Sequence, residues 1–177
     1  MIRANNFAVE TRLTKPASIQ LDLFDRRFRM LHERSFEAVS TIPDNELFLI
    51  TAGMERAKAA QTFGEALLRS GAAVEQTFGG IMTRLWDDPF EWTLPEELST
   101  SRKVMDYLNE VEAVRKKGFA FFTSDDDFLK QIPAPEQIRP IFDILLETLA
   151  RAEHFQGRAF ALLDLLPHRK PAQPSKL

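Results

Sequence analysis

The three histidines of this chain are its most versatile side chains for chemistry, because imidazole transfers protons near neutral pH and binds metals. His32 lies beside an apolar stripe, whereas His154 lies on a charged helix face. The structural interpretation is a partly buried His32 and a solvated His154. The functional alternative is that the two converge between helices, with Glu33 or Glu153 as a third ligand for zinc or iron.

Charged residues suggest two further sites. The run Asp125–Asp127 lacks the alternating oxygen ligands and central glycine of a calcium loop, so a solvated helix cap is the expected role. Arg69 and Arg151 would form an anion pocket if their helices face each other, and would otherwise be solvated. The chain has no phosphate-binding glycine loop, nucleophile elbow or paired-histidine zinc motif.

Composition excludes several classes of protein. The 177 residues fit one domain, and without cysteine the chain has no disulfide or thiolate site. A net charge of −3 gives no reason to bind nucleic acid, and no apolar run approaches a membrane span. We therefore expect a cytoplasmic protein. The C-terminal Ser175-Lys176-Leu177 would direct it to peroxisomes only if the source is eukaryotic.

Apolar residues recur at spacings of three and four, which predicts an all-α protein with helices over 18–42, 62–86, 100–123 and 140–166. A long crossover over 87–99 joins the second helix to the third. Residues 1–17 are expected to be a polar extension and 167–177 a disordered tail. Residues 44–61 are expected to be a connection with a helical turn at Met54–Ala60, and no segment shows strand alternation.

The second helix has a clear start and an unusual glycine content. Thr62 and Glu65 form a capping-box signature. Each interior glycine costs about 1 kcal/mol relative to alanine. Gly71 and Gly79 are therefore expected to allow a neighbouring helix to approach closely; the alternative is a bend at Gly79-Gly80.

Two segments resemble the DinB/YfiT-like family. Residues Thr62–Arg69 are similar to its Ser/Thr-x-Gly-Glu-Leu-Leu-x-His opening, and Arg151–Arg158 to its His-x-x-x-His-x-Gly-Gln segment. The resemblance spans roughly residues 18–166. It implies an up-down-down-up four-helix bundle, often a homodimer, that binds a divalent metal through three histidines. Some members are thiol-dependent transferases or isomerases.

At the three ligand positions of the family this chain has Arg69, Arg151 and Phe155, and His154 matches a neighbouring histidine that is not a ligand. None of the three residues binds a divalent metal, so no cofactor is expected. Helical spacing predicts that Phe155 points inward and His154 away. The two arginines are expected to reach Glu75, Glu153 or solvent.

The leading interpretation is a metal-free relative of these bundles that binds a small molecule or associates with protein. The alternative is a metal- and thiol-dependent transferase or isomerase with a site rebuilt around His32 or His154, using a metal such as zinc or nickel. A third alternative is a plain structural or oligomerisation module.

Overall fold

The computed structural model describes residues 18–50, 62–89 and 97–167. This part of the chain is mostly helical. Its long helices are α1 (Ile19–Ser40), α3 (Phe63–Thr83), α4 (Ser101–Phe119) and α5 (Ile141–Leu163), each within about four residues of the predicted bounds. The expected N-terminal extension, most of the expected C-terminal tail and the expected turn at Met54–Ala60 lie outside the described residues.

Of the short elements, only the cap at the start of the second was expected from the sequence. Helix α2 (Asp44–Leu47) follows α1, and the 3-10 helix η2 (Asp125–Leu129) follows α4. Strands β1 (Gln131–Pro133) and β2 (Ile138–Pro140) form an antiparallel hairpin before α5. The expectation that the chain has no strand is therefore wrong. Three-residue strands that each end in proline are too short to show alternation.

Caps explain where the helices begin. The Thr62 hydroxyl accepts a hydrogen bond from the Glu65 amide at 3.2 Å, and the Glu65 carboxylate accepts one from the Thr62 amide, as predicted. Asp127 caps η2 by accepting hydrogen bonds from the amides of Thr123 and Ser124. The acidic run therefore includes the helix cap expected from the sequence, but Asp127 is buried and not solvated as expected.

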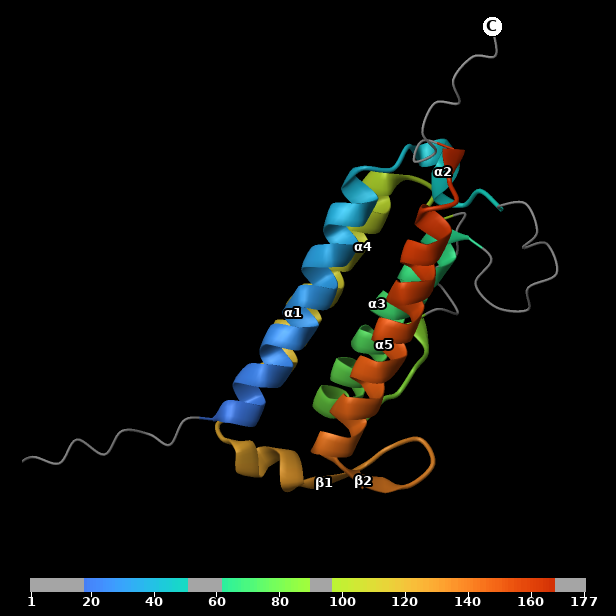
Figure 1. The fold of residues 1–177 in the computed structure, drawn as a ribbon. Helices are drawn as coiled ribbons and strands as arrows, with labels where there is room; N and C mark the ends of the chain where they lie inside the picture. Colours follow the sequence, from blue (N-terminus) through green and yellow to red (C-terminus); the bar gives the residue numbers. More distant parts are fainter. Residues whose placement is uncertain (1–17, 51–61, 90–96, 168–177) are drawn as a thin grey trace, which may run out of the picture.

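The long helices lie side by side (Figure 1), and each packs against two others. Helices α1 and α3 each contact both α4 and α5, and the contact between α3 and α5 is the most extensive. The amide of Ser101, which starts α4, donates to Asp44 just after α1 at 2.7 Å. At the other end, Asp125 accepts hydrogen bonds from the amides of Gln20 and Leu21 and so caps α1 from a distance.

Phenylalanine fills one end of the core. Phe28 of α1 packs edge-on against Phe78 of α3 at 5.3 Å between ring centroids, and Phe119 of α4 lies 5.2 Å from Phe78. Phe122 and Phe128, which follow the C-terminal end of α4, continue this cluster. Edge-to-face rings fill space densely without a polar group to satisfy.

Polar side chains cross the middle of the core. Gln156 of α5 is 1% exposed, and its amide nitrogen donates to the Leu31 carbonyl and the Ser35 hydroxyl of α1, each at 2.7 Å. Ser35 is a polar residue within the apolar stripe of α1, between Leu31 and Val39, and its hydroxyl is satisfied by the hydrogen bond from Gln156. The prediction that Phe155 points inward is wrong: Gln156, one residue along, faces the core, and Phe155 is half-buried at its side.

The glycines of α3 differ in their surroundings. A Cβ atom on Gly71 would lie 3.2 Å from the Tyr107 ring of α4, so this residue does allow close approach. A Cβ atom on Gly79 would meet nothing within 4 Å. The expectation of close packing at Gly79 is therefore wrong, because this side of the helix turns toward open space.

None of the helices in the described ranges is both long enough and apolar enough to span a membrane.

Candidate functional site

Two pockets adjoin along α3 and α5, and we refer to them together as the α3/α5 groove. The larger has a volume of about 270 Å³ and the smaller about 180 Å³, and both are lined by Gln76 and Arg151. The lining of the larger pocket also includes Thr77, Trp86, Glu136, Arg139, Glu147 and Thr148, and that of the smaller includes Arg69, Asp88 and Phe155.

Gln76 holds the junction of the two pockets together. Its amide nitrogen donates to the Trp86 carbonyl at 3.0 Å, and its amide oxygen accepts a hydrogen bond from the Arg151 guanidinium at 2.8 Å. The Trp86 indole in turn donates to the Pro133 carbonyl at 3.1 Å. One side chain of α3 therefore fixes an arginine of α5, while Trp86 ties the end of α3 to the hairpin.

Two threonines form part of the floor of the larger pocket. The hydroxyls of Thr77 and Thr148 lie 2.6 Å apart and are buried. Thr148 donates to the Ile144 carbonyl at 2.7 Å, so Thr77 donates to Thr148. Both hydroxyls are committed within the protein, which makes this floor a structural support.

The larger pocket is lined by two carboxylates, Glu136 and Glu147, and two arginines, Arg139 and Arg151. Arg139 forms ion pairs with Glu147 and Asp143, and the hydrogen bond that it donates to the Glu147 carboxylate holds the pKa of Arg139 above its ordinary value. Arg151 forms no ion pair with any residue in the described ranges, and its guanidinium donates to the neutral Gln76. Carboxylates line both pockets, but none in the described part of the chain lies within ion-pair distance of Arg151.

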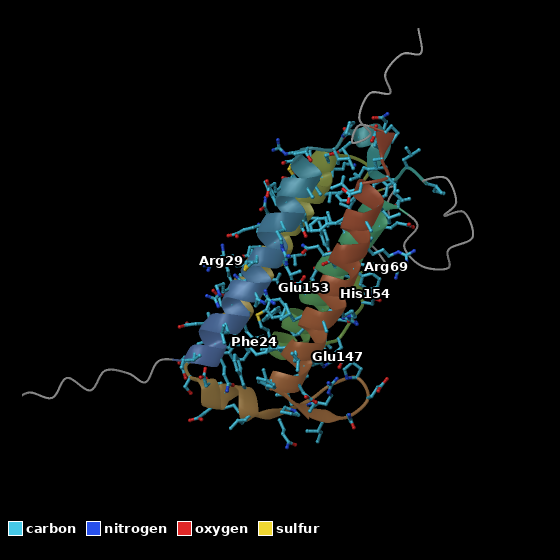
Figure 2. All side chains as sticks on the ribbon, viewed as in Figure 1. Phe24, Arg29, Arg69, Glu147, Glu153 and His154 are labelled. Carbon is cyan, nitrogen blue, oxygen red and sulfur yellow. The ribbon has the colours of Figure 1, made fainter. Side chains whose placement is uncertain are left out.

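An aromatic ring forms one wall of the smaller pocket. The Arg69 guanidinium lies 6.0 Å from the centroid of the Phe155 ring, at the outer limit of a cation–π contact. Figure 2 places Arg69 and Glu147 on the α3 and α5 side of the molecule, and Arg29 on α1. The described lining of this pocket contains two arginines against one carboxylate, that of Asp88, beside an apolar face. Net positive charge next to an aromatic ring suits an organic anion.

The structure brings together three of the four residues that the sequence analysis grouped. Arg69, Arg151 and Phe155 all line the smaller pocket, whereas His154 is exposed and does not line it. The arginines were expected to reach Glu75, Glu153 or solvent. Arg151 instead donates a hydrogen bond to Gln76. Glu75 accepts a hydrogen bond from Tyr107, and Glu153 pairs with Arg34.

The two histidines do not converge. His32 of α1 faces α4 near Glu112, while His154 is exposed on α5. Burial lowers the pKa of His32, partly offset by Glu112. The hollow beside His32 has a volume of about 20 Å³, which holds about one water molecule and no substrate. Among the described residues, no three metal-binding side chains cluster.

Sequence reasoning missed Gln76, Trp86 and Glu147. A signal for two of them was present, because Gln76 lies seven residues after Arg69 and Glu147 four residues before Arg151. Residues at these spacings share one helix face. Trp86 follows the end of α3, so helical spacing gives no indication of its position.

No family model, curated protein or solved structure matches the chain. The described lining of the α3/α5 groove contains carboxylates, arginines and threonines, and no histidine, cysteine or serine. The groove offers charge, hydrogen bonds and aromatic surface.

Proposed function

We propose that this protein binds a small organic anion in the α3/α5 groove. The observation that carries the proposal is Arg151, a cation that Gln76 holds at the junction of two pockets and that has no ion-pair partner among the described residues. A preorganised guanidinium binds carboxylate in a bidentate geometry. Trp86 and Phe155 supply aromatic surface on either side of it.

Benzoate is the simplest probe of this proposal, because it combines a carboxylate with an aromatic ring. We expect calorimetry to detect benzoate binding and no binding of benzylamine, which has the same ring and the opposite charge. Arg151→Gln should weaken benzoate binding by about tenfold or more, as expected for a hydrogen bond to a charged group. Arg102→Gln, which removes an exposed arginine on α4, should leave it unchanged.

Equal binding of benzoate and benzylamine, or benzoate binding that survives Arg151→Gln, would overturn the assignment of Arg151 as the anion-binding group. If neither probe binds to the parent protein, the groove is not a site for aromatic anions.

We further propose that the four long helices form an up-down-down-up bundle of the DinB/YfiT-like kind that has lost its metal ligands. In support, α3 and α4 both start at the end of the molecule where α1 finishes: Ser101 binds Asp44, and Gly64 packs against Phe48. The family's homodimer is part of this proposal, and light scattering across micromolar concentrations tests it.

A change of three residues tests the proposed family position. The triple variant Arg69→His, Arg151→His and Phe155→His should bind zinc or nickel, because these residues line one pocket and would then supply three imidazoles. The single variants should not bind, since one histidine gives too few ligands. Elemental analysis and calorimetry would measure the stoichiometry. Stoichiometric metal in the parent protein, lost on His154→Ala, would show that the ligand positions were assigned in the wrong register.

A further inference from the structure

A second, apolar hollow lies on another face of the molecule, between α1 and α5. We call it the α1/α5 groove. Its volume is about 640 Å³, and its apolar lining consists of Leu23, Phe24, Met30, Phe142, Leu146 and Leu149. None of these residues lines the α3/α5 groove, so the two sites are separate.

The groove exists because α1 and α5 each carry more apolar surface than the core uses. Phe24 is buried, but Leu23 is 44% exposed, Met30 36% and Leu146 49%. Leu23 and Met30 are seven residues apart on α1, and Leu146 lies between Phe142 and Leu149 on α5. Residues at these spacings form continuous stripes on a helix. A contiguous exposed apolar surface of this kind marks an interaction site.

The charged residues of this groove are all of one sign. Arg26 and Arg27 are the charged side chains in its described lining, and both come from α1. Neither forms an ion pair with any residue that the structure describes. By contrast, Arg34 on the same helix is paired with Glu153 at 2.9 Å. The surface is therefore complementary to a partner that presents carboxylates beside apolar side chains.

We propose that the α1/α5 groove binds an amphipathic helix of another protein, with an apolar stripe flanked by Asp or Glu. Leu23 to Met30 and Phe142 to Leu149 each span seven residues, about 10 Å at the rise of an α-helix. This length accommodates an occupant of about two to three turns. Helices bind in such grooves through anchors at i, i+3, i+4 and i+7.

Two other possible occupants of the groove, a second copy of this chain and its own residues 1–17, complement Arg26 and Arg27 less well. A second copy of this chain presents no acidic side chain in the described lining of its own groove, so its arginines would face apolar surface or the arginines opposite. Residues 1–17, which lead into α1, contain three basic residues against one acidic residue. Charge therefore favours an acidic partner over either of these two occupants.

A matched pair of peptides tests this proposal by fluorescence anisotropy. Both are helical, about 15 residues long, with leucines at i, i+4 and i+7; one has glutamates beside the leucines and the other lysines. We expect the parent protein to bind the glutamate peptide at least tenfold more tightly than the lysine peptide. Leu146→Glu should weaken binding of the glutamate peptide by tenfold or more, and Arg26→Glu with Arg27→Glu should reverse the preference. Arg102→Gln is the control and should change neither affinity.

Each other result overturns the proposal. Equal affinity for both peptides, with no reversal in the double arginine variant, would show that charge does not select the partner. Failure of the parent protein to bind either peptide would show that the groove is not a helix site. A parent protein that dimerises, and becomes monomeric with Leu146→Glu, would show that a second copy occupies the groove. Circular dichroism of each variant checks that the fold is retained.

Discussion

At the scale of single residues, two neighbouring glycines of α3 lie in opposite surroundings. A Cβ atom on Gly79 would meet no atom within 4 Å, whereas a Cβ atom on Gly80 would overlap the indole of Trp86. The indole is held between the α3 backbone and the Pro133 carbonyl to which it donates. Gly80 is therefore needed for the close approach of Trp86, a wall of the α3/α5 groove, while Gly79 is not needed for packing.

Alanine at the two positions should have opposite effects on stability. Gly79→Ala should raise the free energy of unfolding by up to about 1 kcal/mol, because alanine restricts the unfolded chain and meets no obstacle in the helix. Gly80→Ala should lower it by about 1–3 kcal/mol through overpacking, and should also weaken benzoate binding by displacing Trp86. Urea denaturation compares the two variants. Destabilisation by both would mean that Gly79 has a packing role that its surroundings do not show.

The neighbouring residues Phe155 and Gln156 show how far sequence resolves single positions. Successive residues of an α-helix are rotated by about 100°, so a stripe read from spacing is uncertain by one residue at its edge. Apolarity favoured Phe155 as the inward residue. The deciding fact is the partner on another helix: Ser35 and the Leu31 carbonyl satisfy the Gln156 amide nitrogen. Such a pairing between α1 and α5 has no signature within either helix.

At the scale of elements, α1 and α4 are joined by a buried cluster of charges. Arg115 of α4 is 2% exposed and donates to Glu112 at 2.7 Å and to Asp25 of α1 at 2.6 Å. Burial alone would raise the pKa of Glu112, but hydrogen bonds and charge from Arg115 more than offset it, so its pKa lies below the ordinary value. The ionised pair is thus the stable form at neutral pH.

Removing one partner of this charged cluster should lower the free energy of unfolding more than replacing both Glu112 and Arg115 with apolar residues. Glu112→Gln should destabilise the protein by about 3 kcal/mol at pH 7, because it leaves Arg115 buried with one remaining carboxylate. The double variant Glu112→Leu and Arg115→Met should recover most of the lost stability.

The stabilisation by Glu112 should depend on pH. Since folding lowers the pKa of Glu112, its contribution to the free energy of unfolding is present above the ordinary carboxyl pKa and is lost as the pH falls through the lowered value. The difference between parent and Glu112→Gln should therefore narrow below about pH 4. Denaturant unfolding at pH 7 and pH 3 measures this difference in the free energy of unfolding. The same difference at both pH values would contradict the role of the ionised carboxylate.

Helices were predictable as elements because each signal is local. The Thr62 and Glu65 cap and the spacing of Val104, Leu108 and Val111 lie within a turn or two of the segments that they define. The hairpin before α5 was not predictable, because its strands are held by pairing between Ile132 and Arg139 and not by a pattern within either strand. The same reason limits how well the site can be predicted from the sequence. Arg69 and Arg151 could be placed on helices, but their common pocket depends on how α3 packs against α5.

At the scale of the whole molecule, burial is uneven among the helices. Of the 21 residues of α3, 14 are buried, compared with 6 of the 22 residues of α1. Helix α3 packs extensively against both α4 and α5, whereas the contact between α1 and α5 is smaller and is hollowed by the α1/α5 groove. The free energy needed to open a segment increases with the apolar surface that the segment buries. The molecule should therefore open at α1 before it opens at α3.

Native-state amide hydrogen exchange can measure this order. The amides of Leu67, Val74 and Phe78 in α3 should exchange only through global unfolding, because every turn around them is buried. Amides of Leu23 and Arg27 on the outer side of α1 should exchange faster, through local opening that exposes little surface and so depends weakly on denaturant. An acidic helix bound in the α1/α5 groove would bridge α1 and α5 and should slow exchange in α1 without changing the fastest amides elsewhere. Equal protection of α1 and α3, with equal dependence on denaturant, would instead show that the four long helices unfold as one cooperative unit.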